Sequence, residues 1–362
     1  PVPGLFPPER VLDNMHWKKI SRVGAGYFNH GNTCFLNSTL QCLYHIPAFT
    51  QVLIQDRNML LKANNQSRQK SVFEHYLRFV ISFVVSFCSY ILTSLPDFRF
   101  VEEASSPNCA RVISPRGMVQ NIRLVSKQFR PMRQEDAHEY LRQLLDCMHE
   151  DILKARGLKI SSGKIAETTL ISRIFGGYLC NELKCSSCHY SSKTYNHFQD
   201  LSLDVVHGIR SVEEAISAFI RPERLGAGNE WLCGGCKKKV QATKQMTIAK
   251  APNVLVLHLK RFSFGHGFGK VTKPISYEPN LHLPCSSEST KTVPYSLNGI
   301  IVHHGGSVHS GHYVAYVKAP NGEWNEMNDT HVSSVSQKTV LNSQAYVLFY
   351  VRSDVKKSKP PA

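Results

Sequence analysis

Two short cysteine pairs place the strongest constraint on how this chain can fold. Cys185 and Cys188 are separated by two residues, and Cys233 and Cys236 repeat that spacing 48 positions further along. Four thiolates from two such turns close a tetrahedral zinc site, which is saturated and therefore structural. Binding of one zinc ion would clamp together the strands that carry the two pairs.

Other interpretations of the four cysteines are open at this point. They could be unrelated buried cysteines, and a redox pair is disfavoured because neither copy follows a thioredoxin-like βαβ pattern. A zinc ribbon that binds nucleic acid is also compatible with them. The formal net charge of +16 favours an acidic partner, although basic residues are spread along the chain and are dense only in the tail at 356–359.

The cysteine count indicates a reducing compartment. Eleven cysteines are an odd number in a long chain without a signal-peptide pattern, which argues against a disulfide scaffold. Residues 79–96 carry no charge and are about long enough to span a bilayer. They also contain four serines and a threonine, so we favour a buried core helix and no membrane association.

The order of helical and strand patterns predicts an α+β fold. Residues 34–160 are mostly helical in pattern, with one apolar face repeating around Leu36, Leu40 and Leu43. From about residue 170 the pattern changes to strands. The clearest strands are expected at 254–262, 299–302, 312–317 and 345–351. Helices first and strands later indicate segregated layers.

Cys34 lies where a helix should begin, directly after Gly31-Asn32-Thr33. The dipole and free N–H groups of a helix start lower the pKa of a thiol, and they can also hold a developing oxyanion. Asn29 could donate a side-chain amide to the same oxyanion. On position alone, a small buried cysteine is an equally good interpretation.

A nucleophilic cysteine needs a base, and His312 is the best candidate. It follows a glycine-rich loop and begins a strand, which would fix its imidazole. His303, His304 and His309 compete with it. A third group often orients the ring. Asn328 would hydrogen-bond the imidazole, and Asp329 could do so instead or support the site from further away.

Taken together, the motifs resemble those of the ubiquitin-specific protease family of deubiquitinases, which are papain-like cysteine peptidases. Besides the two cysteine pairs, six segments carry the resemblance in the family's order: GYFNHGNTCFLNSTLQCL (26–43), QEDAHEYL (134–141), LVLHLKRF (255–262), HSGHYVAYV (309–317), NEMNDTHVS (325–333) and AYVLFY (345–350).

The resemblance implies a catalytic domain at 23–353 between a lead-in at 1–22 and a basic tail at 354–362. The domain would have a helical thumb at about 23–165, zinc-binding fingers at about 170–260, and an antiparallel palm at about 166–175 and 250–353. The structural zinc would lie in the fingers, and the enzyme would be a monomer.

The resemblance also implies the activity and its residues. Cys34, His312 and Asn328 or Asp329 would hydrolyse the isopeptide bond after ubiquitin's terminal glycine, with Asn29 at the oxyanion. The basic, extended ubiquitin tail would bind four further residues, namely Gln134, Asp136, Glu139 and Tyr313. A catalytically silent ubiquitin-binding scaffold with a basic nucleic-acid-binding surface is the alternative.

Finer features are most like the nuclear and nucleolar branch of the family, which acts on chromatin and ribosome-related targets. We therefore expect a nuclear or nucleolar protein, with the cytoplasm as a further compartment. Two features depart from the family pattern. His30 replaces an apolar residue, and the excursion at 97–121 is longer than expected. A glycine-rich segment at 265–270 falls where relatives carry a mobile loop over the ubiquitin tail.

Overall fold

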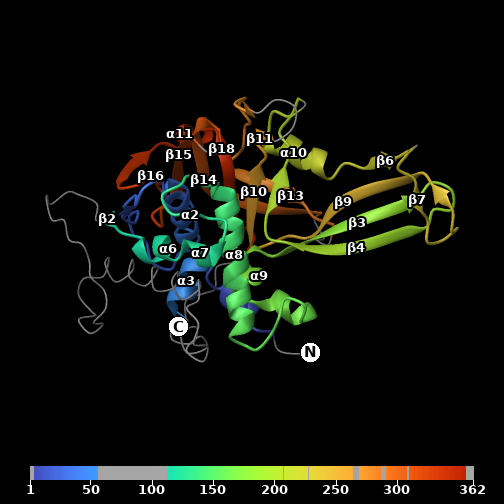
Figure 1. The fold of residues 1–362 in the computed structure, drawn as a ribbon, viewed down its shortest axis with the longest axis horizontal. Helices are drawn as coiled ribbons and strands as arrows, with labels where there is room; N and C mark the ends of the chain where they lie inside the picture. Colours follow the sequence, from blue (N-terminus) through green and yellow to red (C-terminus); the bar gives the residue numbers. More distant parts are fainter. Residues whose placement is uncertain are drawn as a thin grey trace.

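The computed structural model describes residues 4–55, 112–206, 208–226, 228–263, 269–286, 291–307 and 310–355 (Figure 1). The predicted helix at 79–96, most of the excursion at 97–121, most of the loop at 265–270, His309 and the basic tail from 356 lie outside these residues. Within the described part of the chain, no helix combines the length and the apolar character needed to cross a bilayer.

An eight-stranded sheet forms the centre of the molecule. Its order is β17-β16-β15-β14-β18-β10-β5, and β13 also pairs with β14. All neighbours run antiparallel except β10 and β5, which are parallel. The strands are β5 (Leu201–Leu203), β10 (Val254–Leu259), β13 (Asn280–Pro284), β14 (Thr292–Ser307), β15 (Ser310–Lys318), β16 (Trp324–Asn328), β17 (His331–Val335) and β18 (Ala345–Arg352).

Both faces of this sheet are covered, which explains the continuous apolar run in β18. Val347 and Phe349 belong to the core that the sheet shares with the large helices, whereas Leu348 and Tyr350 belong to a second core on the other face. Side chains alternate between the two faces of a strand, so a strand buried on both sides must be apolar throughout. The predicted α+β class is confirmed.

Helices α2 (Cys34–Tyr44) and α8 (Ala137–Lys154) pack together on the first face of the sheet. Every residue of α2 from Cys34 to Leu43 is buried, because the helix lies between α8 and strands β14 and β15. The smaller elements on this side are α1 (Pro8–Leu12), β1 (Gly26–Tyr27), α3 (Pro47–Gln55), β2 (Val112–Ile113), α6 (Arg116–Gln120), α7 (Ile122–Val125), η1 (Gly163–Thr168) and α9 (Leu170–Phe175).

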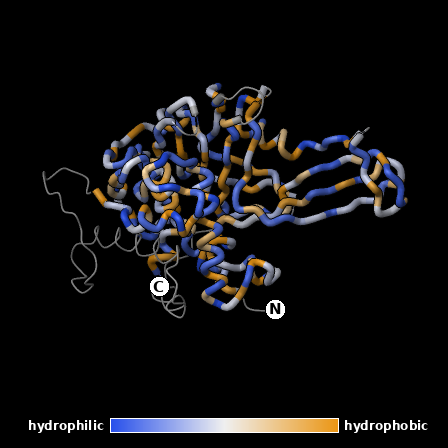
Figure 2. Tube along the Cα trace, viewed as in Figure 1, coloured by the Kyte–Doolittle hydropathy of each residue, from blue (hydrophilic) through white to orange (hydrophobic). Residues whose placement is uncertain are grey.

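A second sheet projects from the body of the molecule (Figure 1). Its order is β4-β3-β9-β6, and a separate hairpin of β7 and β8 lies near its tip. Polar and apolar residues mix along these strands, and most of β4 is exposed (Figure 2). We call this sheet and hairpin the finger region: β3 (Gly177–Cys185), β4 (Ser191–Phe198), β6 (Glu223–Leu225), β7 (Trp231–Leu232), β8 (Lys239–Val240) and β9 (Ala242–Lys250).

Four short elements complete the fold. The hairpin of β11 and β12 follows the end of β10, and α10 and α11 pack on the second core through buried Val212, Ile216 and Val340. Their bounds are α10 (Val212–Phe219), β11 (Phe262–Ser263), β12 (Gly269–Lys270) and α11 (Gln337–Leu341). The predicted strand at 254–262 is therefore two strands, β10 and β11, with a break at 260–261.

Candidate functional site

Cys34 is the first residue of α2, and it directly follows a turn with two left-handed residues. Gly31 and Asn32 both adopt positive φ, at 87° and 57°. Asn29 stabilises this turn because its Oδ1 accepts from the N–H groups of Gly31 at 3.0 Å and Thr33 at 3.1 Å. The N-cap side chain, Thr33, makes no capping hydrogen bond, so it leaves the first N–H groups of the helix available beside Cys34. Cys34 itself is 3% exposed.

His312 lies on β15 and is hydrogen-bonded to both of its predicted partners. Its Nε2 is 2.7 Å from Asn328 Oδ1, which leaves Nδ1 for the hydrogen bond with Cys34. These two bonds, the Cys34 bond first, raise the pKa of His312 to about 9. The half-buried ring is therefore positively charged at neutral pH, as a partner of a thiolate must be.

Asp329 does not take the place of Asn328. Asp329 adopts a φ of 51°, and its carboxylate points instead at the turn before the nucleophile. Oδ2 accepts from Asn29 Nδ2 at 2.8 Å, and Oδ1 accepts from Asn37 Nδ2 at 2.7 Å. Because the Asn29 oxygen is taken by the turn and its nitrogen by a carboxylate, the orientation of that amide is fixed.

Asn37 is a site residue that the sequence analysis missed. It lies three residues after Cys34 on α2, is 2% exposed, and joins that helix to Asp329. The only signal was an amide within a predicted buried helix, and the partner of Asn37 is almost 300 residues away in sequence, so only the fold brings the two together.

Of the competing histidines, the structure describes His303 and His304. His303 is buried on β14, where burial and the Lys270 charge lower its pKa to about 4. The pKa of His304 is also lowered, by burial and by the charge of His312. Neither ring would carry charge at neutral pH, in contrast to His312.

The four residues predicted to bind the ubiquitin tail lie along one side of the site. Gln134 holds the loop before the base, since its amide donates to Gly311 O at 2.7 Å and accepts from Gly311 N at 2.9 Å. Asp136 caps α8 and accepts a 2.5 Å hydrogen bond from Tyr346. Tyr313 is buried with its hydroxyl 3.5 Å from Asp136.

Glu139, the last of the four, is half-buried in the first turn of α8 and pairs with Arg142 at 3.0 Å. Tail binding by this set stays a prediction. Further along α8, a cavity of about 260 Å³ opens between the helix and the end of β4. Its polar lining residues are His138, Arg142, Asp146, His197, Gln199 and Asp200.

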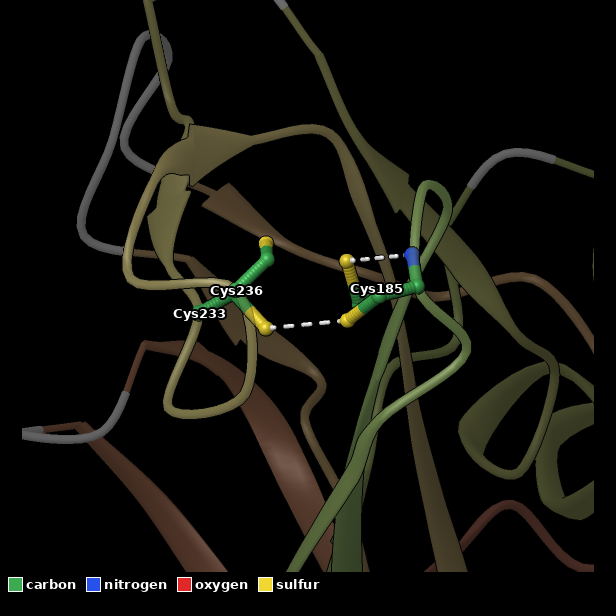
Figure 3. A group of neighbouring side chains, drawn as sticks. Cys185, Cys233 and Cys236 are labelled. Atoms are coloured by element: carbon green, nitrogen blue, oxygen red, sulfur yellow. Dashed lines mark hydrogen bonds between the residues drawn. The ribbon is translucent and has the colours of Figure 1, made fainter.

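The second predicted centre lies in the finger region. Cys185, Cys188, Cys233 and Cys236 place their sulfur atoms within 4.8 Å of one another, and Cys188 and Cys233 are 3.6 Å apart. Figure 3 shows the two turns facing each other. A tetrahedral zinc site with 2.3 Å bonds separates its sulfurs by about 3.8 Å, so the cluster fits this metal.

Each of the two turns is built to carry a thiolate. Cys185 Sγ accepts from the Cys188 N–H at 3.3 Å, and Cys233 Sγ accepts from the Gly235 N–H at 3.3 Å. The hydrogen bond from the Cys188 N–H is the main cause that lowers the pKa of Cys185 to about 6. These donors stabilise the deprotonated sulfur that a metal ion requires.

The two turns also close in the same way. His189 and Lys237 each follow the first cysteine of their pair by four positions, and they adopt φ 60° and 58°. Each donates its N–H to the carbonyl of that cysteine, at 3.2 and 2.9 Å. One turn lies between β3 and β4, and the other lies between β7 and β8. Two such turns with the same backbone geometry are expected where they bind one metal ion, and not for unrelated cysteines.

The family model of ubiquitin carboxyl-terminal hydrolases matches residues 25–350, a span that includes both centres. The chain belongs to this family. It is 36% identical to a probable ubiquitin carboxyl-terminal hydrolase 16 of Schizosaccharomyces pombe, over 99% of this chain and 74% of the relative. It is 37% identical to ubiquitin carboxyl-terminal hydrolase 23 of Arabidopsis thaliana, over 91% of this chain but only 36% of that relative.

Solved structures give the same result. Ubp8, in a SAGA DUB module bound to monoubiquitin, superimposes with a TM-score of 0.71 at 28% identity, covering 92% of this chain and 70% of that one. The hydrolase family and its fold are therefore those that the sequence motifs indicated.

Proposed function

We propose that this chain is a thiol-dependent deubiquitinase that cleaves the isopeptide bond between the C-terminal glycine of ubiquitin and a lysine of a protein or of another ubiquitin. One observation carries the proposal: Cys34 at a helix start is hydrogen-bonded to a His312 ring that Asn328 orients at 2.7 Å. Family membership supplies the substrate class.

The geometry supports the following reaction. His312 holds the proton of Cys34 as an ion pair, and the thiolate attacks the glycine carbonyl. The second Asn29 amide hydrogen and the Cys34 N–H then stabilise the oxyanion. His312 gives its proton to the leaving lysine amine, and water attacks the thioester with His312 as the base. Asn328 keeps the ring in place in both steps.

The test is mass spectrometry of the chain after incubation with ubiquitin that carries a C-terminal electrophile. We expect one adduct of ubiquitin mass, located on Cys34 by peptide mapping. The Cys34→Ala variant should form no adduct and lose turnover, yet still bind unmodified ubiquitin. An adduct on another cysteine, or turnover by Cys34→Ala, would refute the assignment of the nucleophile.

The alternative, a catalytically silent scaffold with a basic nucleic-acid surface, is not favoured, because nucleophile, base and orienting amide are all present and in contact. We further propose that the four finger cysteines bind one structural zinc ion. Nuclear or nucleolar residence and chromatin or ribosome-related targets are proposals that rest on the sequence resemblance alone.

A further inference from the structure

A basic stretch of the chain lies beside the turn that precedes the nucleophile. From residue 112 to residue 134 the sequence contains no aspartate or glutamate. Its five basic side chains are all exposed, namely Arg116, Arg123, Lys127, Arg130 and Arg133. Like charges repel one another, and protein surfaces ordinarily mix the two signs, so an exposed stretch of one sign indicates an acidic partner.

Three of these arginines lie around the catalytic turn, and we call Arg116, Arg130 and Arg133 the arginine surface. Burial, and then the charge of Arg116, lower the pKa of His30 in that turn. The Arg133 N–H donates to the Arg130 carbonyl at 3.3 Å, which closes a tight turn. Glu135 accepts from the main-chain N–H of Arg130 at 3.1 Å. Within the described part of the chain, none of the three guanidinium groups forms an ion pair.

Met132, between two of these arginines, holds their turn against the turn of the nucleophile. It adopts a φ of 65°, a left-handed conformation that is uncommon outside glycine. Its carbonyl accepts from Asn32 Nδ2 at 2.8 Å. A Cβ added to Gly31 would lie 2.6 Å from the sulfur and methyl of Met132, so this side chain lies directly on Gly31. Because Asn32 is the second residue before Cys34, the two flanking arginines are held close to the nucleophile.

His30 holds the other side of the surface in place. Its Nε2 is 2.7 Å from Ser114 Oγ, and Phe28 packs edge-on against its ring with centroids 5.0 Å apart. The Phe28 N–H donates to a carbonyl of β2 at 2.9 Å. The histidine that departs from the family pattern thus joins the catalytic turn to the β2 segment. Phe28 is 50% exposed and Met132 is 66% exposed, so apolar side chains accompany the arginines.

The two sides of the nucleophile carry opposite charge. The side predicted to bind the basic ubiquitin tail carries Asp136 and Glu139, which suit such a peptide. The arginine surface would repel that tail. Figure 1 shows β2 and α6 on the side of α8 away from the finger region. This surface therefore suits the group beyond the scissile bond, which is the protein that carries the modified lysine.

We propose that the arginine surface docks the protein from which ubiquitin is removed, and that it selects a lysine surrounded by acidic side chains. The guanidinium groups pair with carboxylates that flank the lysine, and Phe28 and Met132 contact apolar neighbours. This inference rests on the proposed function. The surface takes no part in proton transfer and acts by binding the leaving protein beside Cys34.

The test uses two substrates in which ubiquitin is joined through an isopeptide bond to the lysine of a short peptide. Glutamates flank the lysine in one peptide, and glutamines flank it in the other. The readout is the ratio of the two kcat/KM values, which cancels ubiquitin binding and chemistry common to both. We expect the wild type to prefer the acidic peptide about tenfold at low salt, an effect that three exposed ion pairs can supply. The preference should vanish at about 1 M salt, where charges are screened within about 3 Å.

The triple variant Arg116→Glu/Arg130→Glu/Arg133→Glu should reverse the preference, because its carboxylates repel the acidic peptide. All three side chains are exposed, so the variant should keep its fold, which thermal unfolding would check. A wild-type ratio near one would exclude selection of acidic sequences. An unchanged ratio in the triple variant would exclude these three arginines. Either result overturns the inference.

The matched control is the triple variant Arg156→Glu/Lys159→Glu/Lys164→Glu, which makes the same change in net charge at exposed residues. These residues follow the end of α8, whereas the arginine surface lies before its start, and the helix of 18 residues separates them by about 27 Å. The control should keep the wild-type ratio. Equal changes in both triple variants would show that only net charge matters and would also overturn the inference.

A labelled single-stranded RNA oligonucleotide tests the other acidic class of partner by fluorescence anisotropy. RNA binding that the arginine variant loses, without any preference between the peptides, would assign the surface to nucleic acid and overturn the inference. If wild-type Cys34 fails to react with the ubiquitin electrophile and neither peptide is released, the proposed function is wrong and this inference falls with it. If both peptides are released at equal rates, the proposed function stands and only this inference is wrong.

Discussion

Asp329 accepts hydrogen bonds from two amides near the nucleophile, and none from the base, among the residues that the structure describes. Its carboxylate holds Asn29 at 2.8 Å and Asn37 at 2.7 Å, so its removal should release the oxyanion amide without moving His312. We expect Asp329→Ala to lower kcat about 100-fold, the size of effect seen when an oxyanion donor is lost. Because Asn29 and Asp329 work as one unit, the double alanine variant should be no slower than Asn29→Ala.

The measurement is kcat with a fluorogenic ubiquitin substrate across the four members of this cycle. Coupling of this kind is read from non-additivity. If the losses of Asn29→Ala and Asp329→Ala multiply in the double variant, Asp329 has a role of its own, such as a direct contact with the base that this structure does not contain.

The pKa of His312 should depend on Cys34. The ring titrates at about 9 when folded, above the 6.5 of an ordinary histidine, and the Cys34 hydrogen bond is the first cause. We therefore expect kcat/KM to fall on the alkaline side near pH 9, and NMR of Cys34→Ala to show His312 titrating at lower pH. An unchanged titration in Cys34→Ala would contradict the ion pair.

The same shift has a consequence for stability with a definite sign. Since the folded pKa is raised, the stabilisation by the charged ring is complete below about pH 6.5 and is lost as the pH rises to about 9. The wild type should thus lose its advantage over Cys34→Ala in urea unfolding across this window.

Single residues were predictable where a local pattern surrounds them. The helix start after Gly31 indicates Cys34, and a glycine-rich loop entering a strand indicates His312. The choice between Asn328 and Asp329 was left open, because one residue of difference on a turn reverses the direction of a side chain. The pairing of Lys270 with His303 has no local signal and depends on how β12 meets β14.

At the scale of secondary-structure elements, the proposed zinc ion should decide how stable the finger strands are. The finger sheet has an exposed strand, β4, and buries little apolar surface of its own, so the joined cysteine turns should hold its tip. We expect the purified chain to contain one zinc ion, measured by mass spectrometry of the metal, and Cys188→Ser to lose it together with thermal stability.

The control for this prediction is Cys180→Ser, since Cys180 is a buried cysteine on the same strand, β3, outside the cluster. It should retain the metal whatever it does to the melting temperature. Full metal content in Cys188→Ser would exclude the four-cysteine site.

The elements themselves were predicted better than their arrangement. Periodicity indicated α2 and α8 as helices and the later segments as strands, because burial of one face or of both faces leaves a direct pattern. The order of the central sheet and the parallel edge strand β5 were not predicted. They follow from contacts between segments such as Leu201 and Leu257, which no short stretch of sequence records.

At the scale of the whole molecule, one buried arginine joins the central sheet to the segment that follows β12. Arg261 is fully buried, and its guanidinium donates to Ala345 O at 2.7 Å and to the carbonyls of Val271 and Lys273 at 3.0 Å. It lies at the break between β10 and β11, where the predicted strand was too long. It thereby fixes the chain that leads from Lys270 back to the body.

We expect Arg261→Met to destabilise the fold by about 3 kcal/mol, because methionine fills the space but leaves one buried and two partly buried carbonyls without this donor. Arg261→Lys should not restore stability, since an ammonium lacks the planar fork. Urea unfolding would measure both, with Lys260→Met as the control. Lys260 is exposed, and its side chain makes a surface ion pair with Asp204 at 3.2 Å, so its loss should cost under about 1 kcal/mol.

Arg261→Met also tests whether a change in the segment at 271–273 affects the catalytic pair of Cys34 and His312. If Arg261 acts only by anchoring residues 271–273, Arg261→Met should weaken ubiquitin binding at temperatures where the chain is still folded, because these residues continue the segment that the family resemblance places over the ubiquitin tail. Alkylation of Cys34 by iodoacetamide should stay normal there, because α2 is held by its own burial between α8 and the sheet. Equal loss of binding and of alkylation would mean that the sheet transmits the change to the nucleophile.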